Sequence, residues 1–161
     1  MKYGGKIFHA VVAALVLWAA AATAADPQPA TPGKNDKCPV CGMFVYKYPD
    51  WVGQIVFSDG SIFFFDGAKD LFKYYFNLEK YNPSMKISDI AAIWVTDYYD
   101  VAFLPAKSAF FVVGSDVYGP MGRELIPFKT MEAAVEFKND HHGTSVLTFE
   151  QVTPAVIAKQ D

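Results

Sequence analysis

The feature that most constrains the fold is a pair of apolar, aromatic runs joined by an Asp-Gly turn. The runs are Trp51 to Phe57 and Ile62 to Phe65, and the turn is Asp59-Gly60. Asp-Gly between two such runs is a strong hairpin signal, because both residues tolerate the positive φ that a tight hairpin needs. The sequence therefore predicts two antiparallel strands here.

A helix and a third strand are expected after the hairpin. Ala68 to Glu79 consists of good helix formers with aromatic and aliphatic residues at helical spacing. Asp66 is expected to be the N-cap of this helix. Ile90 to Thr96 is a continuous apolar run, which indicates a strand buried on both faces. The first half of the chain therefore predicts a β-β-α-β unit.

The second half of the chain repeats this pattern weakly. Ala109 to Gly114 and Glu124 to Phe128 are expected strands, and Val146 to Val152 is an expected closing strand. Between them, Met131 to Lys138 is an expected short helix with Thr130 as its N-cap. A second β-β-α-β unit is therefore predicted.

The two expected helices come into register when Phe65 is placed over Phe128, because apolar or aromatic residues then match at several core positions. This internal repeat rests on pattern rather than on identity. It predicts an α+β fold in which two small β-β-α-β modules, about residues 38–100 and 106–153, pack together in one compact body. Residues 154–161 are expected to be a frayed tail.

The N-terminal residues have the pattern of an export signal. Lys2 and Lys6 precede an apolar run from Ile7 to Ala22, and small residues follow at the positions that a signal peptidase reads. We expect residues 1–25 to be a signal peptide with cleavage after Ala24 or Ala25. An uncleaved membrane anchor is the alternative, although the apolar run is short for a spanning helix.

Charge and composition exclude several classes of protein. Removing residues 1–25 takes away two of the 14 Lys+Arg and none of the 17 Asp+Glu, so the mature chain has a formal charge of 12 − 17 = −5. An acidic exported protein without a basic cluster is poorly suited to nucleic acid or to anionic membrane surfaces. Hydrophobic residues make up 52% of the chain, which supplies a core. Residues 26–37, rich in proline and small polar residues, are expected to be a flexible linker.

The only two cysteines lie in the hexapeptide Cys38-Pro39-Val40-Cys41-Gly42-Met43. Three sulfur side chains within six residues can supply the thiolate and thioether ligands that Cu(I) prefers. The alternative is that Cys38 and Cys41 form a structural or redox disulfide while Met43 fills the core. The hexapeptide alone does not decide between a metal site and a disulfide.

Two further segments contain residues that can bind a metal ion. Met121 lies in Gly119-Pro120-Met121-Gly122, where a turn is expected and where a methionine is more readily presented to a ligand than packed. His141 and His142 follow the second helix, where they can complete a sulfur-rich site or act as cations at the helix C-terminus. The second role is favoured for His141. A structural zinc site lacks a second ligand pair at the usual spacing.

The sequence contains no GxSxG, HExxH, Walker or EF-hand pattern. Asp97 and Asp100 have no nucleophile nearby in sequence, which favours turn and surface roles. The alternative functions are a periplasmic CxxC thiol/disulfide oxidoreductase and an interaction module braced by a disulfide. An oxidoreductase CxxC is expected to open a helix, whereas strand-like sequence follows Cys41. A binding protein is therefore predicted rather than an enzyme.

Several segments, in order from Cys38 to about Val152, resemble the NosL family of nitrous oxide reductase accessory proteins. They include Cys41-Gly42-Met43, Phe65-Asp66-Gly67, the run from Gly114 to Gly122 (GSDVYGPMG), and that from Glu124 to Phe128 (ELIPF). The resemblance implies two β-β-α-β modules related to the organomercurial lyase fold. It also implies a periplasmic Cu(I) carrier for maturation of the copper centres of nitrous oxide reductase, in cooperation with a membrane transporter complex.

The resemblance further implies a set of copper ligands. These are Cys41 of the Cys-Gly-Met motif and Met121 of the Gly-Pro-Met-Gly motif, with His142 completing the site and with Cys38 and Met43 as further candidates. Many members of the family are lipoproteins, whereas this sequence has no cysteine near the expected cleavage point. The hexapeptide from Cys38 to Met43 (CPVCGM) also resembles the start of short metal-binding domains on metal transporters. A role in the maturation of another copper enzyme, or in metal resistance, is therefore an alternative.

Overall fold

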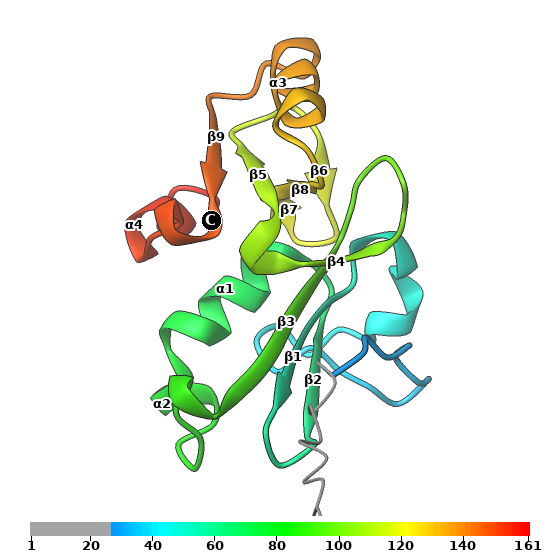
Figure 1. Cartoon of the computed structure of the whole chain (residues 1–161), viewed down its shortest axis with the longest axis vertical. Coiled ribbons are helices and arrows are strands. Elements are labelled where there is room, and N and C mark those ends of the chain that lie inside the picture. Colours follow the sequence, from blue (N-terminus) through cyan, green and yellow to red (C-terminus); the bar gives the residue numbers. More distant parts are fainter. Residues whose placement is uncertain (1–26) are drawn as a thin grey trace, which may run out of the picture.

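The computed structural model describes residues 27–161, so the predicted signal peptide lies outside the described residues. Two antiparallel sheets are arranged along the long axis of the molecule, with α1 (Ala68–Phe76) beside the first sheet and α3 (Met131–Asp140) at the far end of the second (Figure 1). The predicted α+β class is confirmed. No helix in residues 27–161 combines the length and the hydrophobicity needed to cross a membrane.

The first sheet has the strand order β2-β1-β3-β4. Its strands are β1 (Gly53–Phe57), β2 (Ile62–Phe65), β3 (Ile90–Thr96) and β4 (Phe103–Pro105). β1 and β2 form the predicted antiparallel hairpin, and Gly60 in the connecting turn has a φ of 87°. The Asp59 carboxylate fixes this turn by accepting hydrogen bonds from the Ser61 amide and hydroxyl.

The helix predicted after the hairpin is present but interrupted. α1 ends at Phe76, and Asn77 separates it from the short helix α2 (Leu78–Tyr81). Leu71 and Phe72 of α1 are 0% exposed. Full burial of side chains of this size stabilises the fold by about 1.5–3 kcal/mol each, so α1 is a central element of the core.

β3 is less buried than its apolar sequence predicted. Its C-terminal half is mostly buried, but Ala91 is exposed and Ile90 is half-buried. β4 pairs only with Trp94 to Thr96, so within residues 27–161 the outer side of Ile90–Ile93 has no paired strand. The expectation of burial on both faces is therefore wrong for the first half of this strand.

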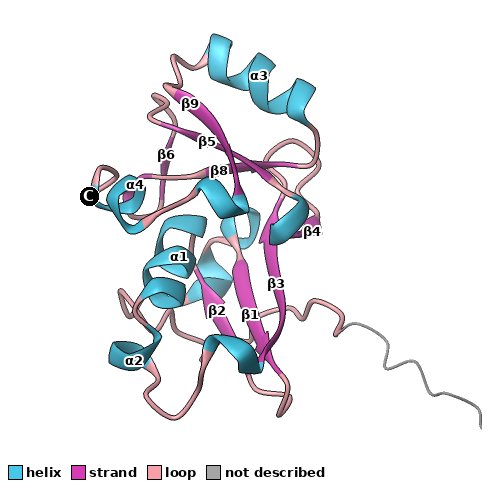
Figure 2. Cartoon of the chain, turned by 60° about the vertical axis from the view of Figure 1, so that its left-hand side comes forward, coloured by secondary structure: helices cyan, strands magenta, loops and turns pink. Residues whose placement is uncertain are grey.

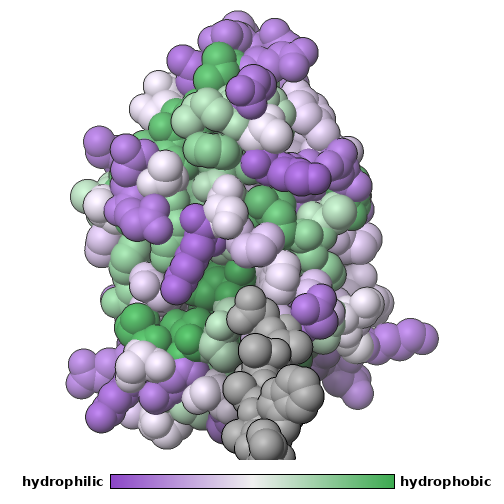
Figure 3. Space-filling view, in the orientation of Figure 1, coloured by the Kyte–Doolittle hydropathy of each residue, from purple (hydrophilic) through white to green (hydrophobic). Residues whose placement is uncertain are grey.

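The second sheet has the order β8-β5-β9, with β5 (Phe110–Val113), β8 (Ile126–Phe128) and β9 (Ser145–Thr148). β8 contains Pro127, which an edge strand tolerates because one side of it needs no ladder hydrogen bonds. α3 follows β8 and begins as predicted, since the Thr130 hydroxyl accepts a hydrogen bond from the Ala133 amide at 3.2 Å. Hydrophilic residues gather over α3 at the upper end of the molecule (Figure 3).

Two short strands lie between β5 and β8. β6 (Tyr118–Gly119) and β7 (Gly122–Arg123) form a separate antiparallel hairpin, and Met121 lies in its turn. The turn was expected from the sequence, whereas the two short strands on either side of it were not. The hairpin belongs to neither larger sheet, so its position depends on contacts other than strand pairing with them.

One core joins the two sheets. Phe72 of α1 lies against Phe111 of β5 and against Phe149, with ring centroids 5.3 and 5.0 Å apart. A smaller apolar cluster, which includes Phe128 and Phe137, lies between the second sheet and α3. The first sheet and the second sheet therefore share most of their core through α1.

Both ends of the described chain are packed. Residues 154–161, expected as a frayed tail, contain the helix α4 (Pro154–Ala158), which lies next to α1 (Figure 2). The reason is that Ile157 is an apolar side chain buried in the shared core. In the expected linker, the backbone N–H and C=O of Ala30 bond to the Gln54 side chain at 2.9 and 3.2 Å. This segment is therefore attached to β1.

Candidate metal centre

The fold brings the two cysteines next to two aspartates at the start of α1. Cys38 and Cys41 belong to the loop before β1, and Asp66 and Asp70 lie just before and within the first turn of α1. One ligand atom from each of these four residues lies within 4.8 Å of the other three. We call these four residues the Cys-Asp group. Residues 25 to 32 positions apart in sequence thus form one local set of two thiols and two carboxylates.

A tight loop holds the two cysteines close together. The Cys38 amide donates to the Met43 carbonyl at 2.9 Å, and the Gly42 amide donates to the Cys38 carbonyl at 2.8 Å. Gly42 has a φ of 79°, which residues with a side chain rarely adopt, so glycine permits this turn. A bridge between Lys37 and Phe44 closes the loop at its base.

Each thiol of the Cys-Asp group donates to one carboxylate. Cys38 Sγ lies 3.4 Å from Asp70 Oδ2, and Cys41 Sγ lies 3.2 Å from Asp66 Oδ1. The prediction that Asp66 caps α1 is wrong: the N-cap position is Gly67, and no side chain of its own caps the helix. The physical reason is that the Asp66 carboxylate faces the Cys41 thiol instead of the helix amides.

The Cys-Asp group is buried unevenly. Cys38 and Asp66 are each 1% exposed, whereas Cys41 is half-buried. Burial raises the pKa of the Cys38 thiol far above its ordinary value and raises the pKa of the Cys41 thiol to about 12. Both thiols therefore carry protons at neutral pH, because a buried thiolate is poorly solvated. A metal ion must displace these protons, and Cys41 is the more accessible point of entry.

One oxygen of the Cys-Asp group is buried without a hydrogen-bond partner. Among the described residues, Asp66 Oδ2 is fully enclosed and accepts no hydrogen bond. A buried polar atom without a partner costs about 1–3 kcal/mol, and a cation held by the group would remove that cost. Two thiols with neighbouring carboxylates form a donor set that suits a soft or borderline metal ion.

The other predicted ligands lie in different places. Met43 belongs to the cysteine loop and is half-buried. Met121 is 42% exposed in the β6–β7 turn, and its carbonyl accepts a hydrogen bond from Lys69 Nζ in α1 at 2.8 Å. His142 is exposed after α3 and is not a member of the Cys-Asp group. Its neighbour His141 lies 3.1 Å from Asp116, with Nδ1 facing Oδ1.

Sequence reasoning missed Asp66 and Asp70 as parts of the site. Asp66 was assigned to capping, and Asp70 was not singled out. A signal was present, since the two carboxylates stand four residues apart at a helix start, which places them near one face. What the sequence could not show is that the cysteine loop lies against that face.

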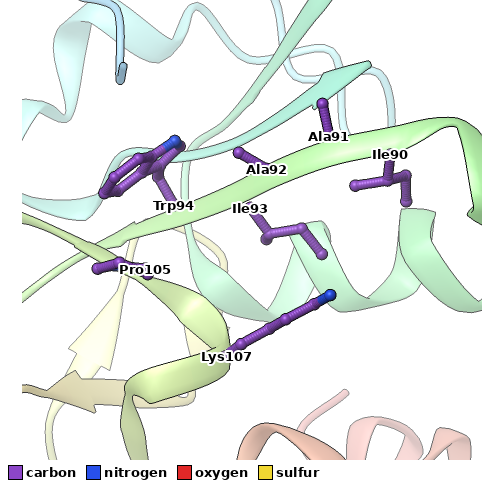
Figure 4. Close-up of a pocket in the computed structure, with 7 residues that line it drawn as sticks. All are labelled: Ile90, Ala91, Ala92, Ile93, Trp94, Pro105 and Lys107. Atoms are coloured by element: carbon purple, nitrogen blue, oxygen red, sulfur yellow. The ribbon is translucent and has the colours of Figure 1, made fainter. Parts of the chain in front are cut away.

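A separate cavity of about 190 Å³ borders the edge of β3. Figure 4 shows its lining, where Lys107 extends below Ile93. The lining residues are Ile90, Ala91, Ala92, Ile93, Trp94, Pro105 and Lys107. Small-molecule sites usually enclose about 300–1,000 Å³, and none of these residues belongs to the Cys-Asp group. The Cys-Asp group therefore does not line this cavity.

Sequence comparison places most of the chain in one family. The sequence profile of the NosL family matches residues 29–157. The copper-binding lipoprotein NosL of Stutzerimonas stutzeri is 29% identical over 126 residues, which are 76% of this chain and 65% of that protein. The match thus spans slightly less than two thirds of the relative's length.

Comparison of folds agrees with the sequence match. The crystal structure of the copper chaperone NosL from Shewanella denitrificans has a TM-score of 0.68 to this chain, covers 81% of this chain and 98% of its own, and is 24% identical. This similarity shows a shared fold. The solution structure of apo-NosL from Achromobacter cycloclastes is 27% identical, with a TM-score of 0.47 over 65% of this chain and 87% of its own.

Proposed function

The chain belongs to the NosL family, and from this premise we propose that it is a periplasmic copper chaperone. It carries Cu(I) for maturation of the copper centres of nitrous oxide reductase. The observation that carries the proposal is the Cys-Asp group at the start of α1, with its enclosed and unpartnered Asp66 oxygen. The name of the relative from Stutzerimonas stutzeri, a copper-binding lipoprotein, supports copper as the metal.

Sulfur decides which metal ion this site prefers. Cu(I) is soft and binds thiolate and thioether, whereas carboxylates alone suit harder ions. In the proposal Cys41 and Met121 bind copper, Cys38 supplies a second thiolate, and Met43 is a further thioether in the cysteine loop. His142 lies outside the Cys-Asp group, so it joins the site only if the loop after α3 moves.

The carboxylates have a separate role in the proposal. In the metal-free protein Asp66 and Asp70 hold the two thiols in place as hydrogen-bond acceptors. Copper binding releases the thiol protons. Because burial raises the pKa of both thiols, the protons return readily when copper leaves. This property favours release over retention.

The uneven burial of the group suits delivery. Cys38 is enclosed, whereas Cys41 is half-buried, so a thiolate or thioether of an acceptor can approach copper from the Cys41 side. Ligands can then be exchanged one at a time without free copper. We propose nitrous oxide reductase and its membrane transporter complex as the partners, and another copper enzyme as the alternative.

A thiol/disulfide oxidoreductase is the weaker candidate. Such enzymes use a thiolate whose pKa is lowered by a helix N-terminus or a nearby cation. Here burial and the carboxylates Asp66 and Asp70 raise the pKa of the Cys41 thiol. Burial and the two carboxylates therefore disfavour a reactive thiolate. They are compatible with a thiol that loses its proton only when a metal ion binds.

Copper binding is tested by titrating Cu(I) into the reduced protein against a chromophoric chelator. We expect one Cu(I) per chain, not displaced by Zn(II). Cys41→Ala is expected to lower the affinity by more than about 100-fold and Met121→Ala by about 10-fold or more, since even residues outside the ligand shell are worth about 10–100-fold. His142→Ala is expected to change it little. A Cys41→Ala protein that binds Cu(I) as tightly as the unmodified protein would refute the ligand assignment.

Delivery is tested separately from binding. The copper-loaded protein is mixed with copper-free nitrous oxide reductase, with and without the membrane transporter complex, and transfer is timed. Transfer that is faster than release to a chelator alone supports direct exchange between proteins. The three rates to compare are those to the enzyme alone, to the enzyme with the transporter complex, and to a chelator. Equal rates in all three would contradict delivery to this enzyme but not copper binding.

A further inference from the structure

The proposed copper ligands come from two parts of the chain that share no sheet. The cysteine loop lies against the start of α1, whereas Met121 lies in the β6–β7 turn. The β6–β7 hairpin has only two residues in each strand and pairs with neither larger sheet. Something other than strand pairing must therefore hold the turn of Met121 in place.

Lys69 is a buried cation in the first turn of α1. It is 3% exposed, and lysine is almost never buried to this degree without partners. Its Nζ donates to the Met121 carbonyl at 2.8 Å and to the Gln160 carbonyl at 3.1 Å, and lies 3.9 Å from Asp161 Oδ1. The Lys69 ammonium thus holds the backbone of the residue whose side chain is proposed as a ligand.

Glu124 attaches the other end of the same hairpin to the same lysine. It follows β7 directly and is 3% exposed. Its Oε1 accepts hydrogen bonds from the backbone N–H of Lys69 and from that of Leu125. A Cβ added at Gly67 would overlap Oε2 of Glu124, and one at Gly119 would lie 3.1 Å from its Cγ. The carboxyl group of Glu124 is thus enclosed between the start of α1 and the hairpin.

We propose that Lys69 is the positioning residue of the copper site. Its backbone amide binds the base of the β6–β7 hairpin through Glu124, and its ammonium binds the tip through the Met121 carbonyl. The next residue in the chain, Asp70, accepts the Cys38 thiol. Two successive residues of α1 therefore hold the methionine turn and the cysteine loop together. This proposal rests on the proposed function, because it takes Met121 as a copper ligand.

The test compares Lys69 with a lysine whose side chain contacts neither the hairpin nor the Cys-Asp group. Lys69→Leu removes the ammonium and keeps an apolar side chain, without adding a sulfur atom that could itself bind Cu(I). The control is Lys80→Leu in α2, because the Nζ of Lys80 contacts only Tyr81 in residues 27–161. Three quantities are measured in each full-length protein: the Cu(I) affinity, the free energy of unfolding, and amide hydrogen exchange of residues 118–124 without metal.

We expect Lys69→Leu to lower the Cu(I) affinity about as much as Met121→Ala does and to speed hydrogen exchange in residues 118–124. Lys80→Leu is expected to do neither. The double variant Lys69→Leu with Met121→Ala is expected to bind Cu(I) no more weakly than Met121→Ala alone, because both changes act through one contact. Further loss in the double variant, or normal affinity in Lys69→Leu, would overturn the proposal.

Two outcomes need separate treatment. If Met121→Ala alone binds Cu(I) normally, the ligand assignment of the proposed function fails, while the exchange comparison still decides whether Lys69 holds the turn. If Lys69→Leu does not fold, Lys69→Gln replaces it, since the glutamine side chain is one bond shorter than that of lysine and carries no charge. The same loss of affinity and the same faster exchange are then expected, and their absence counts against the proposal.

Discussion

The helices α1 and α3 follow corresponding strands but begin in different ways. When Phe65 is aligned with Phe128, Gly67 of α1 matches Thr130 of α3. Thr130 caps its own helix by accepting the Ala133 amide. α1 has no side-chain cap of its own, and Glu124 of the second half of the chain accepts the Lys69 amide instead.

The difference between the two N-caps explains why the side chains at the start of α1 can take part in a metal site. Because Glu124 does the capping, Asp66 is free to face Cys41. In α3 the residues aligned with Asp66 and Asp70 are Lys129 and Ala133, which provide no carboxylate. α3 is therefore complete through local contacts, whereas α1 depends on the second half of the chain and carries the candidate metal centre.

The largest expected effect on stability is that of Gly67→Ala. The added Cβ would overlap Oε2 of Glu124 and lie 2.9 Å from its Cδ. Overpacking a buried site costs about 1–3 kcal/mol, and displacing the Glu124 carboxyl group leaves the Lys69 amide unpaired, which costs about 1–3 kcal/mol more. Denaturant unfolding measures the loss. Gly33→Ala is the control, since its Cβ would meet only Asp36 Oδ2 at 3.4 Å, and an equal loss there would contradict this explanation.

A smaller effect is expected from the titration of Glu124. Burial raises the pKa of this carboxyl to about 8, above the value of about 4.3 for an unfolded glutamate. Between these two pH values the folded protein keeps a proton that the unfolded chain has released. Its contribution to stability is therefore fully present below about pH 4.3 and is lost as the pH rises to about 8.

Glu124→Gln removes this titration and keeps an acceptor for the Lys69 amide. Unfolding free energies of the two proteins at pH 5 and pH 8 test the expectation. The decline from pH 5 to pH 8 is expected to be steeper in the unmodified protein than in Glu124→Gln. The same decline in both proteins would show that Glu124 carries no proton in this range.

The smallest effect is expected at the locally capped helix. Thr130→Ala removes the side-chain cap of α3, which typically costs about 1 kcal/mol. Because α3 carries no member of the Cys-Asp group, the Cu(I) affinity is expected to stay unchanged. Unfolding and copper titration of the same sample measure both quantities. Weaker copper binding in this variant would contradict the independence of the two helix starts.

The features predicted correctly from sequence are those that neighbouring residues determine. The Asp59-Gly60 hairpin and the Thr130 cap depend on contacts within a few residues, and both are present. The errors concern contacts between distant parts of the chain. The tail packs as α4 because Ile157 reaches the shared core, and Asp66 leaves the capping position because Cys41 lies beside it.

The candidate site was predictable in part for the same reason. Residue type pointed to Cys38 and Cys41, which the fold brings together with two carboxylates. Met121 stays a prediction that rests on the family resemblance and on its place in a turn. Carboxylates at a helix start are common as caps, so Asp70 gave no comparable signal. Only the fold shows that Asp70 meets Cys38, 32 residues earlier in the chain.

The central claim is that sulfur atoms of the cysteine loop and of Met121 bind the copper ion. It is tested most directly by X-ray absorption at the copper K edge of the Cu(I)-loaded protein. We expect a first shell dominated by sulfur. Met121→Ala is expected to lose one sulfur scatterer, and Cys41→Ala to lose the ordered shell. A shell of oxygen and nitrogen alone, or a spectrum that is unchanged in Cys41→Ala, would contradict the claim.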